Sequence, residues 1–170
     1  MEAADAFLQT VYSFFLAIMI YPKVQKCAQA ELDAVVGIER LPTFEDRDVL
    51  SCIDAICSQS TMPHVCTEDI IYDGFILHDE TTYPDPEVFK PDRFLGENPQ
   101  PDPQSACFGY GIRICSVAMS LAVFEISGCV ENGVEDIPRM SMGDGTVFHP
   151  ELFHCRIMPR SAKAEALTRG

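Results

Sequence analysis

Basic residues are scarce in this chain of 170 residues, which holds 12 Lys and Arg against 26 Asp and Glu and has a formal net charge of −14. Proteins that bind nucleic acids neutralise the phosphates with clustered Lys and Arg side chains. The composition therefore excludes nucleic acid as an expected partner. The acidic surface by itself indicates only a contribution to solubility.

Apolar runs long enough to cross a bilayer are also absent. The stretch 6–20 is apolar, but its length of about 15 residues is short of the roughly 20 that a membrane-spanning helix needs. The chain opens on Met1-Glu2-Ala3-Ala4-Asp5, which is acidic where a secretory signal peptide is basic. We expect a buried helix over this stretch and an intracellular protein without a signal peptide or membrane anchor, in a compartment that the sequence does not identify.

Closely spaced cysteine pairs of the C-x-x-C type are missing, although the chain has eight cysteines, at positions 27, 52, 57, 66, 107, 115, 129 and 155. Zinc sites and disulfide scaffolds use regular cysteine spacings. The scattered positions instead predict free and mostly buried thiols in a reducing compartment. A zinc site built from His64, Cys66, His154 and Cys155 is the alternative, although its spacing fits no usual template.

Helical patterns dominate the first third of the chain. Residues 3–20 predict a core helix that is apolar on nearly all sides. A second helix is predicted to open at Pro22 and to end at Gly37, with its apolar stripe at Val24, Ala28, Leu32 and Val35. A third helix is predicted to start from an N-cap at Thr43, which forms a capping box with Asp46, and to stop at about Cys57.

The remaining chain is expected to mix short strands with loops. Strand pieces are predicted over 63–77 around a turn at Asp73-Gly74, and a late strand around 153–157. Six prolines make 83–104 a loop with little regular structure. These patterns predict one domain, residues 1–170, of a mainly α fold with some β-structure (α+β).

The most informative segment is Phe108-Gly109-Tyr110-Gly111-Ile112-Arg113-Ile114-Cys115. It places a cysteine at the end of a glycine-bearing loop, just before an apolar, helix-forming run over 117–124. Amide N–H groups at a helix N-terminus stabilise a thiolate, and glycines let the backbone approach a bulky ligand. An arginine two residues before the cysteine can hold a carboxylate. This is the layout of a loop that binds haem through a thiolate.

The segment closely resembles the cysteine-ligand signature of cytochrome P-450 enzymes, F-x-x-G-x-R-x-C-x-G. The matching residues are Phe108, Gly109, Gly111, Arg113 and Cys115, whereas Val117 stands where the signature has its last glycine. The resemblance implies that Cys115 is the axial thiolate ligand of a haem iron. It also implies that Arg113 contacts a haem propionate. The implied cofactor is haem (iron protoporphyrin IX), with these residues in its binding loop.

Other segments resemble the same family in the same order. Residues 21–26 are similar to its J-helix region, 63–74 to the strand entry after its K helix, 78–94 to its proline-rich meander, and 149–161 to its C-terminal hairpin. The resemblance implies a C-terminal fragment of the cytochrome P-450 fold, with pieces of the I, J, K and L helices. The chain would be a single partial domain.

Three family features are missing. No E-x-x-R motif occurs, so Arg93 of the meander is expected to lack its helix partners and to leave the meander without an anchor. Asp5 aligns with the family's acid for proton delivery and is a weak catalytic candidate, but Ala6 and Phe7 replace the alcohol. An ordinary residue in the first turn of a helix is an equal explanation of Asp5.

Gaps are expected after Cys57, between Ile76 and His78, and after Cys115, where Val117 would crowd a haem.

The resemblance implies a haem-thiolate monooxygenase that uses dioxygen, and electrons from a reductase, to oxidise a small apolar substrate. The alternative is a catalytically dead remnant or a mis-spliced product. A small haem-sensing or metal-binding protein that uses Cys115 with His64 or His154 is a third possibility. The substrate and the position of its oxidation are not encoded in this part of the sequence.

Overall fold

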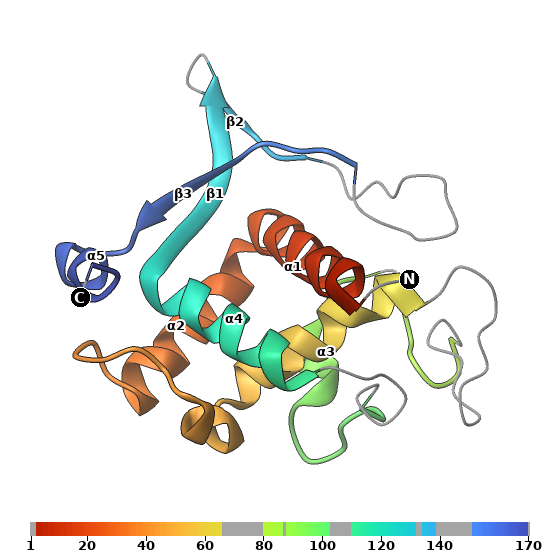
Figure 1. Cartoon of the computed structure of the whole chain (residues 1–170). Helices are drawn as coiled ribbons and strands as arrows, with labels where there is room; N and C mark the ends of the chain where they lie inside the picture. Colours follow the sequence, from red (N-terminus) through yellow and green to blue (C-terminus); the bar gives the residue numbers. More distant parts are fainter. Residues whose placement is uncertain are drawn as a thin grey trace.

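The computed structural model describes residues 3–65, 80–86, 88–102, 110–131, 134–138 and 151–169. Helices lie on one side, and a small sheet projects from them (Figure 1). The elements, in chain order, are α1 (Ala3–Ile20), α2 (Pro22–Val35), the 3-10 helix η1 (Phe44–Val49), α3 (Ser51–Val65), the 3-10 helix η2 (Pro91–Phe94), α4 (Tyr110–Val123), β1 (Phe124–Glu131), β2 (Val134–Asp136), β3 (Cys155–Pro159) and α5 (Ala162–Leu167).

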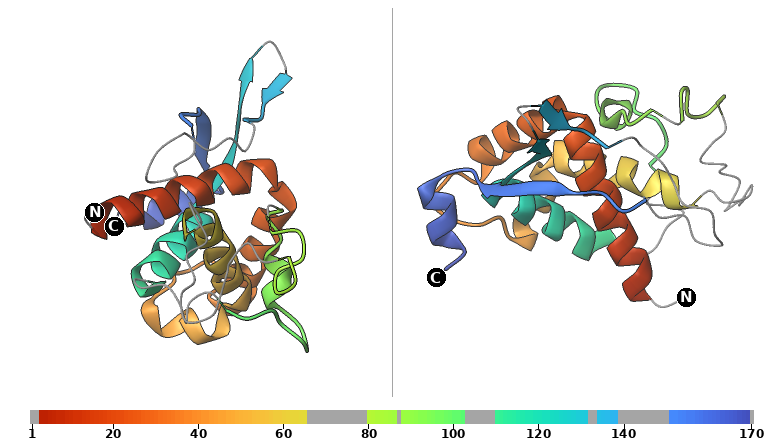
Figure 2. Two further views of the ribbon diagram at one scale, coloured as in Figure 1. Left: turned by 90° about the vertical axis from the view of Figure 1, so that its right-hand side faces the viewer. Right: turned by 90° about the horizontal axis from the view of Figure 1, so that it is seen from above.

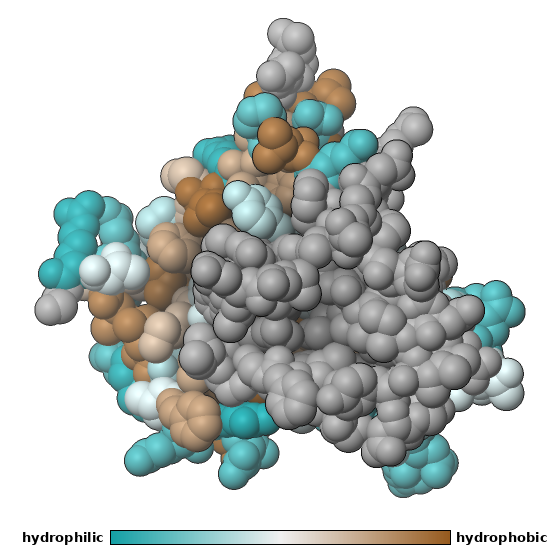
Figure 3. Space-filling model, turned by 45° about the vertical axis from the view of Figure 1, so that its right-hand side comes forward, coloured by the Kyte–Doolittle hydropathy of each residue, from teal (hydrophilic) through white to brown (hydrophobic). Residues whose placement is uncertain are grey.

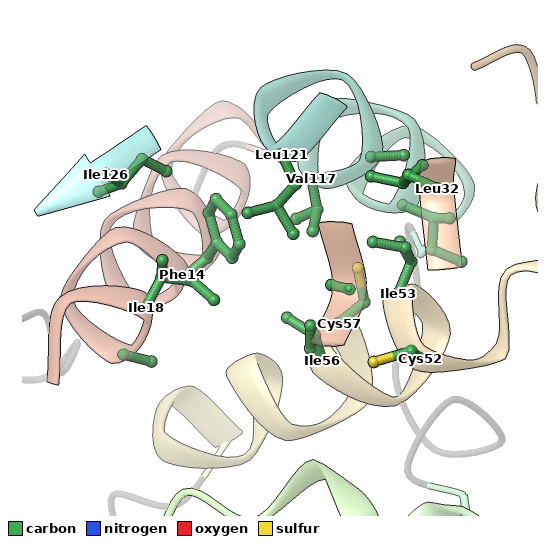
Figure 4. Close-up of a cluster of buried hydrophobic side chains, with 14 of the residues drawn as sticks. Phe14, Ile18, Leu32, Cys52, Ile53, Ile56, Cys57, Val117, Leu121 and Ile126 are labelled. Atoms are coloured by element: carbon green, nitrogen blue, oxygen red, sulfur yellow. The ribbon is translucent and has the colours of Figure 1, made fainter. Parts of the chain in front are cut away.

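One hydrophobic core joins the helices α1, α2, α3 and α4 to the sheet. Phe14 and Ile18 of α1 are at most 1% exposed, and they meet side chains of α3 and α4 (Figure 4). Ile126 contributes to the same cluster from β1. The predicted helix over 3–20 is therefore confirmed, and the described side chains of its second half include five buried apolar residues, Phe14, Leu16, Ala17, Ile18 and Met19. Within the described part of the chain, no helix combines the length and apolarity needed to span a membrane.

The predicted ends of α2 are correct, but its predicted buried face is partly wrong. Pro22 occupies the first turn, where its missing N–H costs nothing, and Gly37 follows the helix with a positive φ of 79°. Val35 is exposed, whereas Gln25 and Gln29 are buried. The reason is that β1 lies against this face and supplies hydrogen-bond partners for both amides.

The predicted third helix is correct in existence and wrong in both boundaries. The capping box of Thr43 and Asp46 starts η1, and α3 begins only at Ser51. Helix α3 does not stop at Cys57, because the polar run Ser58-Gln59-Ser60 is at most 2% exposed and continues the helix. Tertiary burial thus overrides the polar composition of this run. The strand pieces predicted over 63–77 are wrong for residues 63–65, which belong to α3, and the rest of this prediction lies outside the described residues.

The sheet has three antiparallel strands in the order β2-β1-β3. Strand β1 follows α4 directly and passes from β3 to β2 along its length, with Ile126 opposite Ile157 and Cys129 opposite Asp136. Viewed from above, β3 runs across the helices towards α5 (Figure 2). The late strand was predicted, and β1 was not, because its apolar residues continue the pattern of the helix before it.

Candidate functional site

Helix α4 carries Cys115. Its core-facing stripe repeats at helical spacing, with Ile114, Val117 and Leu121 each at most 2% exposed. Cys115 is one position beside this stripe, and its free thiol is half-buried. Met119, one turn later, is 44% exposed. The thiol therefore lies on the flank of a firmly anchored helix, between the core and the surface.

The local structure around Cys115 differs from the predicted loop. Helix α4 begins at Tyr110, so that Cys115 lies in its second turn. Burial of Ile114 extends the apolar stripe of Val117 and Leu121 back by one turn, which favours helix over loop. The unpaired amide N–H groups of a helix belong to its first four residues. They belong to residues 110–113 and therefore precede Cys115 in the helix.

The other predicted haem-loop residues fall partly outside the described region. Phe108 and Gly109 lie outside it, whereas Gly111 and Arg113 belong to the backbone of α4, with the Arg113 side chain not described. Asp5 lies in the first turn of α1, and its side chain is also outside the described part.

Val117, which is expected to crowd a haem, lies in the hydrophobic core. It is 2% exposed and belongs to the central core cluster (Figure 4). The same helical phase that places Cys115 on the flank turns Val117 towards α1 and α3. The crowding of a haem by its branched side chain stays a prediction.

The expectation that the meander lacks an anchor at Arg93 is wrong, although the acceptors of Arg93 within the described part of the chain include no residue of the preceding helices. Arg93 is 5% exposed, and its guanidinium donates to five acceptors within its own loop: the carbonyl oxygens of Lys90, Pro84, Asp85 and Val88 and the side-chain oxygen of Gln100, at 2.8–3.3 Å. Burial lowers its pKa. All five N–H groups that a guanidinium offers are used. The meander is thus anchored from within.

Metal and cofactor chemistry can be tested against these positions. Within the described residues, no three His, Cys, Asp or Glu side chains gather as a metal site. His154 is exposed just before β3, and burial raises the pKa of the neighbouring Cys155 thiol. The side chain of His64, and Cys66, lie outside the described part, so a zinc site that includes them stays a prediction.

The donor chemistry at Cys115 fits a haem, because a half-buried thiol suits an iron–thiolate bond. The described residues do not form a pocket that would enclose a haem at Cys115. A cavity of about 260 Å³ lies between α2, α4 and α5, but Cys115 does not line it, and ligand pockets usually hold about 300–1,000 Å³. The chain thus places a half-buried thiol on α4, and the described residues do not cover both faces of a porphyrin there.

Comparisons with known proteins agree on one family. The sequence profile described as Cytochrome P450 matches residues 64–130. The chain is 39% identical to Cytochrome P450 monooxygenase 208 of Postia placenta, with 96% of the chain and 40% of the relative covered. It is 37% identical to Cytochrome P450 monooxygenase claR of Ampulloclitocybe clavipes, with 97% and 38% covered. A solved zebrafish cytochrome P450 with abiraterone shares the fold, with a TM-score of 0.70, 22% identity, and 90% of this chain and 44% of that chain covered.

The alignments also bear on the expected gaps. The match to the Postia placenta protein extends over 202 residues, which exceeds the 170 residues of this chain. The relative therefore has internal residues without a counterpart here. The chain spans about 40% of the length of the curated relatives it matches. Motif, helix order, relatives and structural neighbour together show that this chain belongs to the cytochrome P450 family and has a partial form of its fold.

Proposed function

We propose that this chain forms the cysteine-bearing part of a haem-thiolate monooxygenase and that Cys115 is the axial ligand. The half-buried thiol of Cys115 carries the proposal, because it lies on α4 within the segment that matches the family profile. When bound, the haem supplies the iron centre at which dioxygen is activated. A reductase is the proposed electron donor, and a small apolar molecule is the proposed substrate.

The chain's own residues would hold the haem in a simple way. Burial of Ile114, Val117 and Leu121 fixes the rotation of α4, so that the Cys115 sulfur keeps one position on the helix flank. Met119 lies one turn away on the same side and is partly exposed, so it would contribute an apolar contact beside the sulfur. Arg113, two residues before Cys115, is proposed to pair with a haem propionate. Gly111 would let a ligand approach the start of α4.

A catalytically inactive remnant is the second candidate, and specific observations favour it. The E-x-x-R motif is absent, and Ala6 and Phe7 stand after Asp5 where the family has its alcohol. The hydrogen bonds of Arg93 stay within the meander. A relative also has internal residues that this chain lacks. In such a remnant the fold would persist without productive dioxygen chemistry.

A haem-reconstitution experiment tests whether Cys115 binds haem as a thiolate, which the enzyme proposal requires. We expect the purified chain, mixed with haem, reduced and exposed to carbon monoxide, to show the red-shifted Soret band of a thiolate-bound iron at low occupancy. Cys115→Ala should lose this band, and the matched control Cys155→Ala should keep it. A spectrum identical to that of free haem for the unmodified chain would overturn the enzyme proposal. Sequencing the transcript would then show whether the missing segments are encoded.

A further inference from the structure

Two thiols outside the candidate haem site lie in direct contact. Cys27 on α2 and Cys52 on α3 have their sulfurs 3.8 Å apart, and Cys52 donates a weak hydrogen bond to Cys27. Cys27 is exposed, whereas Cys52 is buried at the edge of the hydrophobic core (Figure 4). Neither forms a disulfide in this structure. Solvent thus reaches one member of the pair, and packing holds the other.

The carboxylate of Glu31, one turn from Cys27, joins α2 to the start of α3 beside the two thiols. Both oxygens of Glu31 accept the backbone N–H of Cys52 at 3.0 Å, and the carboxylate also accepts from the N–H of Ile53 and the hydroxyl of Ser51. These bonds cap the N-terminus of α3 with a side chain of α2, where the helix dipole favours negative charge. The cap holds the Cys52 backbone beside Cys27, so the sulfur contact does not depend on flexible loops.

We propose that Cys27 and Cys52 are a redox-sensitive pair that forms a reversible disulfide between α2 and α3 under hydrogen peroxide. A disulfide needs a sulfur separation of about 2.05 Å, so the two sulfurs must approach by about 1.8 Å. Such a change is within reach of side-chain rotation at the exposed Cys27. In a reducing compartment, disulfides of this kind act as reversible sensors.

The exposed thiol reacts first. The Cys27 thiolate attacks one peroxide oxygen and forms a sulfenic acid, and the other oxygen leaves as hydroxide. The Cys52 sulfur then attacks the Cys27 sulfur, and the sulfenic hydroxyl leaves as water with the proton of the Cys52 thiol. In total, two thiols and one peroxide give one disulfide and two waters. Burial raises the pKa of Cys52 to about 12, which makes it the second sulfur to react.

The disulfide would link residues that are 25 positions apart. This loop contains the end of α2, all of η1 and the start of α3. Closing it restricts the unfolded chain, and we expect the midpoint of thermal unfolding to rise by about 10 °C. Reduction with dithiothreitol should reverse the rise.

Peptide mapping tests the bond directly. The folded chain is treated with limiting hydrogen peroxide, alkylated and digested with trypsin. We expect peptide 27–40 linked to peptide 48–93, and tandem mass spectrometry must assign the sulfur because the second peptide also contains Cys57 and Cys66. Linkage to Cys57 or Cys66, or an unlinked peptide 27–40, would overturn the proposal. The same treatment in guanidinium should scatter the linkages.

Variants test the effect on stability. Cys27→Ser changes an exposed side chain, so the variant should fold, and peroxide should no longer raise its unfolding midpoint. Cys155→Ser, the matched control, should keep the full rise. An equal rise of the unfolding midpoint in Cys27→Ser would contradict the proposed disulfide. A bond between Cys27 and Cys52 that leaves the midpoint of the unmodified chain unchanged would contradict its stabilising effect.

Discussion

A single buried amide ties α2 to the sheet at the residue scale. Gln25 is 1% exposed; its amide nitrogen donates to the carbonyl of Ile126, and its oxygen accepts the N–H of the same residue, both at 2.9 Å. Gln29, one turn later, donates to the carbonyl of Phe124. The two side chains thereby satisfy the backbone of β1 on the side that pairs with no strand at these positions. Buried backbone groups require such partners.

Replacement of Gln25 by Ala should therefore be costly. It leaves the N–H and the carbonyl of Ile126 buried and unsatisfied, which should lower the free energy of unfolding by about 3 kcal/mol. Urea denaturation measures the change. Lys26→Ala, at the next and exposed position of α2, is the matched control and should stay within about 0.5 kcal/mol of the unmodified chain. Equal effects of the two variants would show that the amide is dispensable.

At the element scale, Arg93 acts as the internal scaffold of the meander. Its guanidinium joins carbonyl groups from Pro84 to Lys90, and Asp85 reaches it with a positive φ of 53°. The Tyr83 hydroxyl adds a bond to the carbonyl of Pro101 at 2.9 Å. A segment without regular strands thus obtains its order from one cation surrounded by carbonyl oxygens.

Arg93→Lys should loosen this loop, although the charge is kept. An ammonium has three donors and no planar fork, so several buried carbonyls lose their partner. We expect a loss of about 3 kcal/mol in the free energy of unfolding and faster proteolysis between 84 and 100. Arg156→Lys, on the exposed face of β3, is the control for the same chemical change. Unchanged proteolysis in Arg93→Lys would refute the scaffold role.

At the scale of the whole molecule, one core holds together elements from both ends of the chain. Leu121 is fully buried where α4 meets α1 and α3 (Figure 4). The hairpin of β1 and β2 extends beyond this core and mixes apolar with polar side chains at its surface (Figure 3), among them the exposed Val130 and Val134. Stability should therefore be concentrated in the helices.

Leu121→Ala should test this distribution. The cavity should lower the free energy of unfolding by about 3 kcal/mol, and far-ultraviolet and near-ultraviolet circular dichroism should shift together because the helices share one core. Met119→Ala, on the exposed side of the same helix, should have little effect. Separate transitions for the two signals would contradict a single cooperative unit.

The candidate site was only partly predictable. The spacing of Phe108, Gly111, Arg113 and Cys115 identified the segment and the family, because these residue types are needed for the chemistry of a thiolate ligand. The same residues predicted a loop, whereas in the structure burial of Ile114 extends the helix through Cys115. Cys27 and Cys52 were found only in space, since residues 25 positions apart give no periodic signal.

The sequence by itself determined the family, the main helices, the end of α2 at Gly37 and the position of the last strand. These follow from local rules: apolar periodicity, proline and glycine geometry, and motif spacing. Only the tertiary structure decided that α3 continues beyond Cys57, how Arg93 is satisfied and why Gln25 is buried. The physical reason is that a buried polar group is stable only next to its partners. The partner of Gln25, Ile126, is 101 positions away in the sequence, and the acceptors around Arg93 surround its guanidinium only once the loop has folded.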